Sequence, residues 1–356
     1  MTDETDFLLA GPRGRRLCLE LAEDLDPAVR SAVFHLGHDL DPGKGTSRLQ
    51  FRLVIPGDGG FEDGARDVPA SPEELAARIA ALDPPSPSAD TVQSAFEAAV
   101  NSARYWQPPD GEDVLAALPA IRAALTPLAA QVLATPALQP GAQPRRAEQW
   151  TVNWHGPEAP APLGQDPRQT LTDWARGTRA AENRAQDGLG RHANVSGSWW
   201  SIPPRLLRSV GRIPAGLTLV EDPLGWQGAT IIPLRGTGRT LEIGAEGDWT
   251  ALCRRFPLEV TASRRRDWFL TTGRDGRWVI PDWERVAREW DAAHLTVRGY
   301  LGSAGRALMI DGDTASMIAG WDPDQTIWLT DVVREDGGPR QEWHRSAEDD
   351  SWKLPA

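Results

Sequence analysis

The chain has 356 residues, of which 40% are hydrophobic and 25% are charged, and its formal net charge is −12. This is a globular composition, long enough for one large domain or two ordinary ones. The negative charge argues against a protein that coats nucleic acid or an anionic membrane surface through electrostatic attraction. Cys18 and Cys253 stand far apart in apolar runs and predict buried thiols rather than a disulfide. No apolar run approaches about 18 residues and no secretory segment opens the chain, so we expect a cytoplasmic protein without a membrane partner.

The pattern of the first 60 residues does not predict a single type of secondary structure. Alternating leucines over 17–21 suit a strand, whereas the apolar residues over 8–22 also suit a helix, and the pattern does not separate the two. Gly11 to Arg16 reads as a turn with three arginines, either a solvated basic loop or a local contact for an anion such as phosphate. A strand is predicted over 49–55.

Residues 70–135 are predicted to be helical. Ser71 followed by Pro72 has the pattern of a helix start, and further helices are expected over about 89–106 and 113–133. The proline-rich run 136–144 then predicts a domain boundary between about 135 and 150.

Tryptophan usage supports the same boundary. Fifteen of the sixteen tryptophans lie at or after Trp150, which indicates separate cores on the two sides. We therefore predict an α-rich N-terminal domain over 1–140 whose role the sequence does not indicate, a second domain over 148–335, and a polar C-terminal tail over 336–356 that is expected to fray.

The second domain begins with strand and helix patterns in alternation. A polar helix is predicted over 166–187 and a short helix over 248–256, and strands are predicted over 149–156, 196–204, 217–220, 229–234 and 239–243. The first of these strands ends at His155 and Gly156. Trp199 and Trp200 are neighbours in a predicted strand, where successive side chains face opposite ways, so one ring is free to line a cleft.

The stretch 278–331 carries the most distinctive pattern. Pro281 and Asp282 open a predicted helix with Trp283, Val286, Ala287 and Trp290 on one face, and 291–297 then has strand composition and contains His294. A last strand over 326–329 is entered through Asp322, Pro323 and Asp324. Two carboxylates are therefore expected at the mouth of a strand.

The chain lacks the sequence motifs of several classes of enzyme. The chain has no G-x-S-x-G, no P-loop, no G-x-G-x-x-G after a strand and no C-x-x-C. His35 and His38 have helical metal-ligand spacing, but no cysteine or third histidine accompanies them, so we expect no metal site. The remaining polar residues at predicted strand ends are His155, Ser201, His294, Asp322 and Asp324.

In their order, these pieces resemble the ADP-ribosyltransferase fold, the NAD-cleaving, toxin-like class. The resemblance covers about 180 residues and rests on five segments: Trp154-His155-Gly156, Trp200-Ser201-Ile202-Pro203, Thr240 to Gly244, Trp290 to His294, and Asp324 to Trp328. The chain also resembles actinobacterial proteins that end in a similar acidic-Thr-x-Trp-Leu strand. The fold class that follows is α+β, with a mostly helical N-terminal domain followed by a split, mostly antiparallel sheet.

The resemblance also implies a function and a site. It implies ADP-ribosyl transfer or NAD hydrolysis, with NAD as a substrate and a role as a toxin or in defence; the acceptor, a protein or a nucleic acid, is not indicated. Asp324 would be catalytic with support from Ser201, and NAD would be bound by His155, Gly156, Trp199, Trp200 and His294. A carboxylate stabilises the oxocarbenium-like transition state of such a cleavage. The family has glutamate where this chain has Asp324, so the alternative is a non-catalytic module whose tryptophan-lined cleft binds a nucleotide or a protein.

Overall fold

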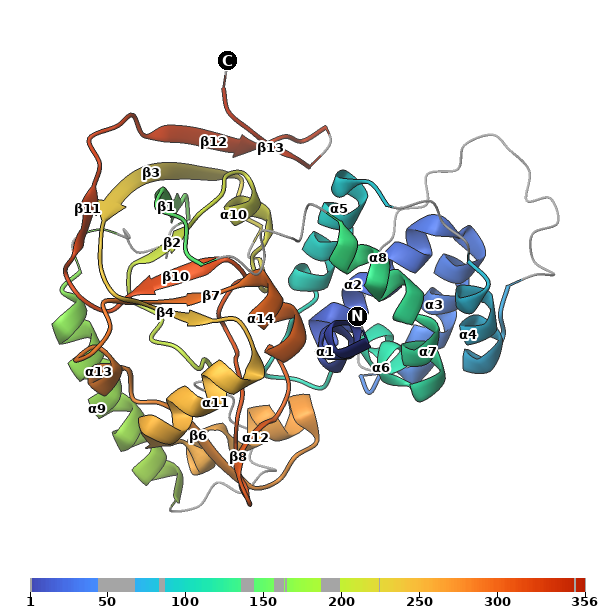
Figure 1. Ribbon diagram of the computed structural model, residues 1–356, viewed down its shortest axis with the longest axis horizontal. Helices are drawn as coiled ribbons and strands as arrows, with labels where there is room; N and C mark the ends of the chain where they lie inside the picture. Colours follow the sequence, from blue (N-terminus) through green and yellow to red (C-terminus); the bar gives the residue numbers. More distant parts are fainter. Residues whose placement is uncertain are drawn as a thin grey trace.

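The computed structural model describes residues 2–43, 68–82, 87–135, 144–156, 163, 165–186, 199–223, 225–348 and 350–355. The described elements form two lobes, one of helices and one built around a sheet (Figure 1). The helical lobe contains α1 (Thr2–Ala10), α2 (Pro12–Leu25), α3 (Pro27–Leu40), α4 (Pro72–Ala80), α5 (Ala89–Asn101), α6 (Gly111–Ala117), α7 (Pro119–Ala124) and α8 (Thr126–Ala134). The strand predicted over 49–55 lies outside the described residues.

Short polar side chains and prolines set the limits of these helices. The side chains of Ser71, Ser88 and Asp110 accept hydrogen bonds from backbone N–H groups in the first turns of α4, α5 and α6. The single helix predicted over 113–133 is instead three helices, because Pro119 and Pro127 lack the N–H that would continue the preceding helix. The undecided pattern over 8–22 is helical.

The second lobe is organised around a sheet in which nine strands are described. Its order is β13-β12-β3-β1-β2-β10-β7-β4, with β11 also paired to β3. Only the β4–β7 pair is parallel, and the other pairs are antiparallel. The strands are β1 (Gln149–Trp154), β2 (Arg208–Val210), β3 (Gly228–Gly236), β4 (Thr240–Ile243), β7 (Ala292–Leu295), β10 (Gln325–Trp328), β11 (Val333–Glu335), β12 (Gln341–Arg345) and β13 (Trp352–Lys353).

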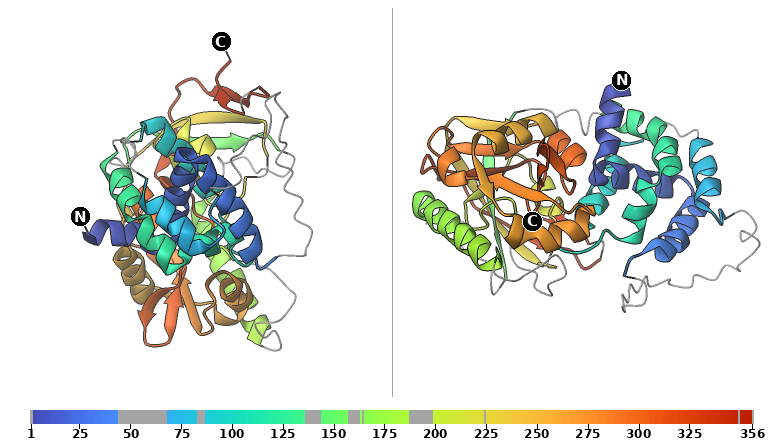
Figure 2. Two further views of the ribbon diagram at one scale, coloured as in Figure 1. Left: turned by 90° about the vertical axis from the view of Figure 1, so that its right-hand side faces the viewer. Right: turned by 90° about the horizontal axis from the view of Figure 1, so that it is seen from below.

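A smaller sheet and the remaining helices complete this lobe. The smaller sheet has the order β5-β6-β9-β8, and α9 lies on the side of the lobe that faces away from α1–α8 (Figure 2). The elements are α9 (Pro167–Gln186), α10 (Ala215–Thr218), α11 (Glu246–Arg255), α12 (Thr261–Thr272), α13 (Trp283–Val286), α14 (Val297–Ser303), β5 (Pro257–Glu259), β6 (Arg277–Pro281), β8 (Leu308–Asp311) and β9 (Thr314–Ser316). The predicted α+β class, with helices mostly N-terminal and a mostly antiparallel sheet in the C-terminal half, is confirmed. None of the described helices has the length and apolar character needed to cross a membrane.

The two lobes share one hydrophobic core. A single cluster of buried side chains runs from Leu17 in α2 to Leu329 beyond β10, so the expectation of separate cores is wrong. The connection is α14, which packs against α1 and α2. A Cβ atom added to Gly11 would collide with the carbonyl of Leu301, and one added to Gly302 would collide with the ring of Phe7. Because glycine has no Cβ atom, it allows the two lobes to pack closely at these positions.

We expect Gly11→Ala to destabilise the protein by about 1–3 kcal/mol, because the added methyl group meets backbone atoms of α14 that have no room to move. Urea denaturation followed by tryptophan fluorescence measures the change. Gly247→Ala in α11 is the matched control, since nothing lies within 4 Å of its new Cβ. Equal stability of the two variants would show that the lobes do not depend on this close approach.

Three predicted segments differ from the structure. No strand is described over 199–204, where the chain instead forms hydrogen bonds to buried side chains. The predicted strand over 217–220 is also absent, and its first residues belong to the short helix α10, which follows Pro214. The expected polar tail contributes β12 and β13 to the sheet, with β12 paired to β3. Trp343 and Trp352 explain this, because they pack with Trp154 and anchor an otherwise polar segment.

Candidate functional site

The described part of the chain contains a cleft of about 1180 Å³ on the larger sheet, which we call the tryptophan cleft. Its aromatic lining comes from Trp150, Trp154, Trp199, Trp200 and Trp226. Two pairs of rings stack: Trp154 with Trp226, and Trp199 with Trp200, each with ring centroids 4.7 Å apart. Stacked indoles present flat apolar faces of the kind that bind planar rings or sugars.

Hydrogen bonds to their backbone carbonyls, rather than strand pairing, hold Trp199 and Trp200 in place. The Trp199 carbonyl accepts a hydrogen bond from the indole of Trp268 at 3.0 Å, and the Trp200 carbonyl accepts from both Nε and Nη2 of Arg264 at 3.3 and 3.2 Å. Trp268 and Arg264 are both buried in α12. The predicted opposite orientation of the two rings is wrong, because these residues are not part of a strand and their rings stack on each other.

Gly320 fixes the position of the Trp200 ring. It has φ +72°, and a Cβ atom there would collide with Cδ1 of Trp200. Glycine is therefore required both by the left-handed backbone and by the close approach of the ring. The ring of Trp199 packs on its other neighbours, Trp106 at 4.9 Å and Tyr105 at 6.3 Å between centroids. Trp199 and Trp200 were both predicted to stack on a ligand. Of these two, Trp200 is the one next to Gly320, which also lines the cleft.

The polar lining of the cleft centres on Asp322. Its Oδ1 accepts a hydrogen bond from the backbone N–H of Glu221 at 2.9 Å, and its Oδ2 accepts from the amide of Gln325 at 2.8 Å. Arg208 lies beside this pair, with its Nη1 3.5 Å from the Gln325 amide oxygen. Burial raises the pKa of Asp322 above its ordinary value, against the smaller opposing effects of Arg208, the Glu221 N–H and Gln325.

Glu221 lines the cleft, and its carboxylate oxygens are buried. The hydroxyls of Tyr105 and Tyr300 lie beside this carboxyl. Burial and the neighbouring Asp322 raise the pKa of Glu221 to about 8, against smaller opposing effects of the two phenols and Arg13. Glu221 is therefore a neutral acid at pH 7, in contrast to an ordinary glutamate.

His155 and Gly156 lie at the rim of the same cleft. The His155 backbone N–H donates to the Gly228 carbonyl at 2.9 Å, which continues the pairing of β1 with β3. Its Nε2 lies 2.8 Å from the Thr230 hydroxyl and 3.5 Å from a Glu342 carboxylate oxygen. Both the ring and this carboxylate are about half exposed, so His155 is available to a ligand at the rim.

Asp324 and His294 lie together, but outside the cleft lining. Asp324 accepts hydrogen bonds from Nε of Arg212 at 3.0 Å and from Nε2 of His294 at 3.3 Å, and His294 Nδ1 lies 2.6 Å from Glu242. Burial lowers the pKa of His294, but its hydrogen bonds to Asp324 and Glu242 outweigh burial and leave that pKa raised. Burial raises the pKa of Asp324, and His294 and Arg212 outweigh it in the other direction.

Ser201 lies behind the tryptophan cleft. It is fully buried, its Oγ donates to the Ala319 carbonyl at 3.1 Å, and the same Oγ accepts from the Ala319 N–H at 3.0 Å. The Ser201 carbonyl accepts from the indole of Trp283 at 2.9 Å. These contacts use the only donor of the hydroxyl to join the 199–202 segment to the segment after β9, and they favour a supporting role.

Several cleft residues were not singled out by the sequence. Arg208 and Gln325 reach the cleft from the paired strands β2 and β10, and Glu221 and Trp226 come from the segment between α10 and β3. The signal that could have found Glu221 is its place just before Asp222 and Pro223, a turn-forming run after an apolar segment.

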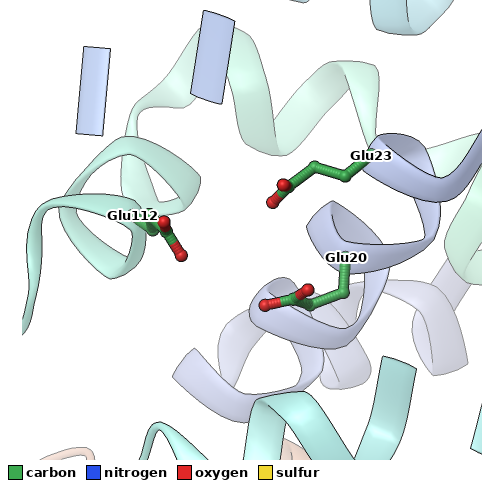
Figure 3. Close-up of side chains that lie close together, drawn as sticks. All are labelled: Glu20, Glu23 and Glu112. Atoms are coloured by element: carbon green, nitrogen blue, oxygen red, sulfur yellow. The ribbon is translucent and has the colours of Figure 1, made fainter. Parts of the chain in front are cut away.

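The three arginines predicted in a turn are in the helix α2. Arg13 is buried and pairs with Asp113, and Arg16 pairs with Asp110 and Glu112, so carboxylates of this chain occupy the place of a phosphate. Figure 3 shows Glu20, Glu23 and Glu112 pointing toward one another, with oxygens within 4.8 Å. Two of these three carboxylates bind Arg16, which accounts for their proximity without a metal ion.

Comparison with known proteins adds no further assignment, because no protein-family model, curated protein or solved structure matches the chain.

Proposed function

We propose that the protein binds NAD in the tryptophan cleft and cleaves its nicotinamide glycosidic bond, transferring the ADP-ribosyl group to water or to an acceptor. The observation that carries the proposal is Asp322, a hydrogen-bonded carboxylate that lines the same cleft as stacked tryptophans. It replaces Asp324 as the proposed catalytic carboxylate, because Asp324 does not line the cleft and instead pairs with Arg212 and His294. The resemblance to ADP-ribosyltransferases supports the same substrate.

The reaction requires the protein mainly to position the substrate and to stabilise the positive charge that develops on it. When the bond between ribose C1′ and the nicotinamide nitrogen breaks, neutral nicotinamide leaves with the bonding electron pair and positive charge develops on the ribose. A carboxylate held near C1′ stabilises this charge, and a water molecule or an acceptor then forms the new bond to C1′ and loses a proton. Asp322 supplies the carboxylate, and the Trp200 face supplies a surface for the planar ring.

Asp322 is better suited to be the charged member of the acid pair than Glu221. Its oxygens receive two hydrogen bonds and lie near the Arg208 cation, which oppose the rise in pKa that burial causes. Burial and the neighbouring Asp322 raise the pKa of Glu221 to about 8, which favours its neutral form. Two neighbouring acids whose surroundings drive their pKa values apart are a common arrangement at catalytic sites.

Incubation of the purified protein with NAD, followed by measurement of free nicotinamide, tests the proposal directly. Time-dependent release that scales with protein concentration is the expected result. Saturable binding of NAD without release would instead favour the alternative, a non-catalytic module that uses the cleft only to hold a nucleotide.

Trp200→Ala is expected to weaken NAD binding by roughly tenfold or more, because base–aromatic stacking contributes about 1–3 kcal/mol. Quenching of tryptophan fluorescence by NAD measures the affinity. Trp290→Ala is a control variant, since Trp290 is partly buried beside Arg239, at 4.9 Å, and does not line the cleft. Gly320→Ala should resemble Trp200→Ala by displacing that ring. Unchanged affinity in both Trp200→Ala and Gly320→Ala would remove the cleft from the proposal.

A further inference from the structure

The only tryptophan before Trp150 in the sequence is Trp106, and it packs on an aromatic residue of the tryptophan cleft. It belongs to the segment 102–110 between α5 and α6, which we call the bracing segment. The centroid of its ring lies 4.9 Å from that of Trp199, and Trp199 stacks in turn on Trp200 at 4.7 Å. The three indoles therefore form one column that begins in the helical lobe and ends in the cleft.

The middle ring of this column is held from both lobes. Trp199 has Trp200 on the cleft side, and on the side of the bracing segment it has Trp106 and the edge of Tyr105, whose centroid is 6.3 Å away. Trp199 and Trp200 line the cleft, whereas Trp106 and Tyr105 lie behind them. The orientation of the cleft rings therefore depends on rings that a ligand does not touch.

Polar contacts fix the bracing segment to the sheet lobe at two points. Nε of Arg104 lies 3.2 Å from a carboxylate oxygen of Asp222, which follows the cleft lining in sequence. The Gln107 carbonyl accepts a hydrogen bond from the hydroxyl of Thr271 at 3.3 Å. Thr271 is in α12, the helix whose side chains also hold the backbone of the cleft tryptophans. One helix thus supports both the bracing segment and the rings on which it packs.

The second stacked pair of the cleft has a different support. Trp154 and Trp226 line the cleft and also a smaller pocket of about 350 Å³, to which α5 contributes part of the wall (Figure 1). Among the described residues, the further ring that packs on Trp154 is Trp352 of β13, and it belongs to the sheet lobe. The Trp154–Trp226 pair is therefore an internal reference for the Trp199–Trp200 pair.

We propose that Trp106 is a positioning residue of the tryptophan cleft, and that through Trp199 it fixes the face that Trp200 presents to a ligand. The helical lobe, whose role the sequence does not indicate, then completes a site whose described lining belongs entirely to the sheet lobe. The orientation of the rings is a property of the chain alone. Only the effect on NAD affinity rests on the proposed function.

The test is fluorine NMR of the full chain labelled with fluorotryptophan, without NAD. The resonances of the four stacked cleft tryptophans are assigned with the variants Trp154→Phe, Trp199→Phe, Trp200→Phe and Trp226→Phe. In Trp106→Ala the Trp199 resonance shifts simply because that ring loses a neighbour. The deciding resonance is that of Trp200, which stacks on Trp199 and makes no ring contact with Trp106. It should shift in Trp106→Ala and return toward the parent position in Trp106→Phe, while Trp154 and Trp226 keep their positions.

Trp290→Ala is the matched control. It removes a partly buried indole that lies beside Arg239 and outside the cleft lining, and it should leave all four resonances in place. Arg104→Gln is the second variant: it keeps every ring, removes the ion pair with Asp222 and should shift the Trp200 resonance in the same direction. An unchanged Trp200 resonance in Trp106→Ala, or an equal shift in Trp290→Ala, would overturn the proposal. If Trp106→Ala does not fold, the same two criteria apply to Arg104→Gln.

NAD affinity is measured separately, by quenching of tryptophan fluorescence. Trp106→Ala should bind NAD about threefold to tenfold more weakly than the parent, because a displaced Trp200 ring stacks less well on the ligand, and Trp106→Phe should recover most of the loss. If the parent binds no NAD, the proposed function fails and the fluorine result stands. If the Trp200 resonance does not move, the positioning role fails and the nicotinamide-release result stands.

Discussion

Replacing Asp322 with asparagine is expected to slow nicotinamide release by at least about a hundredfold, the range found when one charge-stabilising group is removed from an active site. Asparagine keeps the size of the side chain, and its amide oxygen can still accept the hydrogen bond from the Glu221 N–H. What is lost is the negative charge that faces the developing cation. The measurement is initial-rate nicotinamide release at saturating NAD, with the melting temperature taken on the same sample.

Asp324→Asn separates this reassignment from the role that the sequence resemblance gives to Asp324. Its carboxylate binds Arg212 and His294, so the variant should lose stability, because both partners lose a charged hydrogen-bond acceptor in a largely buried place. Below its own melting temperature it should still release nicotinamide. If Asp324→Asn abolishes release and Asp322→Asn does not, the catalytic carboxylate is Asp324 and the cleft assignment is wrong.

The difference between these two aspartates shows what sequence reasoning could and could not reach. Both were expected at the mouth of a strand, and β10 does begin directly after them at Gln325. Asp324, however, has φ +59°, a left-handed conformation that turns the chain between Pro323 and the strand. The two side chains consequently enter different surroundings, Asp322 with Glu221 and Asp324 with His294. Alternation along a strand does not predict such a turn.

Local patterns succeeded where short segments carry their own signal. The predicted strands over 149–156, 229–234, 239–243, 291–297 and 326–329 and the helix over 166–187 are all present within a few residues. Periodic apolar residues and nearby turn residues determine such elements. Trp199 and Trp200 were misassigned because their conformation depends on hydrogen bonds from Trp268 and Arg264, which are more than 60 residues away in sequence.

The acid pair could not be predicted for the same reason. The Glu221 N–H and the Asp322 carboxylate are 101 positions apart in sequence, and only the pairing of β2 with β10 brings their segments together. Arg13, buried in the helical lobe, also affects the Glu221 carboxyl. A prediction of two separate cores excludes such a contact, whereas the shared core around α14 provides it.

Glu221→Gln is expected to stabilise the protein at pH 8 and above, and the gain should disappear at acidic pH. The folded-state pKa of Glu221 is about 8, against 4.5 for the ordinary side chain. A carboxyl with a raised folded pKa contributes stability that is fully present below pH 4.5 and is lost as the pH rises through 8. The difference between these two pKa values corresponds to at most about 5 kcal/mol, since a tenfold change in an equilibrium is about 1.4 kcal/mol. Glutamine has no proton to lose and avoids this cost.

Urea denaturation at pH 5, 6, 7 and 8 measures this effect as the free energy of unfolding. The parent should lose stability steadily across the range, and Glu221→Gln should lose less. Glu335→Gln is the control: that carboxylate is on the surface, and its hydrogen bond to Arg340 lowers its pKa, so the variant should not gain stability at high pH. Parallel pH profiles for the parent and Glu221→Gln would show that Glu221 is ionised at pH 7.

Ionisation of Glu221 is also expected to affect the contact between the two lobes. Glu221 lies in the sheet lobe, while Tyr105 and Arg13, which both affect its pKa, belong to the helical part of the chain. A neutral Glu221 places no charge in this buried region, where burial outweighs the stabilising effect of the two phenols. Ionisation would place one there and weaken the contact between the lobes. Proteolysis of the junction should therefore accelerate between pH 7 and pH 9 in the parent and remain constant in Glu221→Gln.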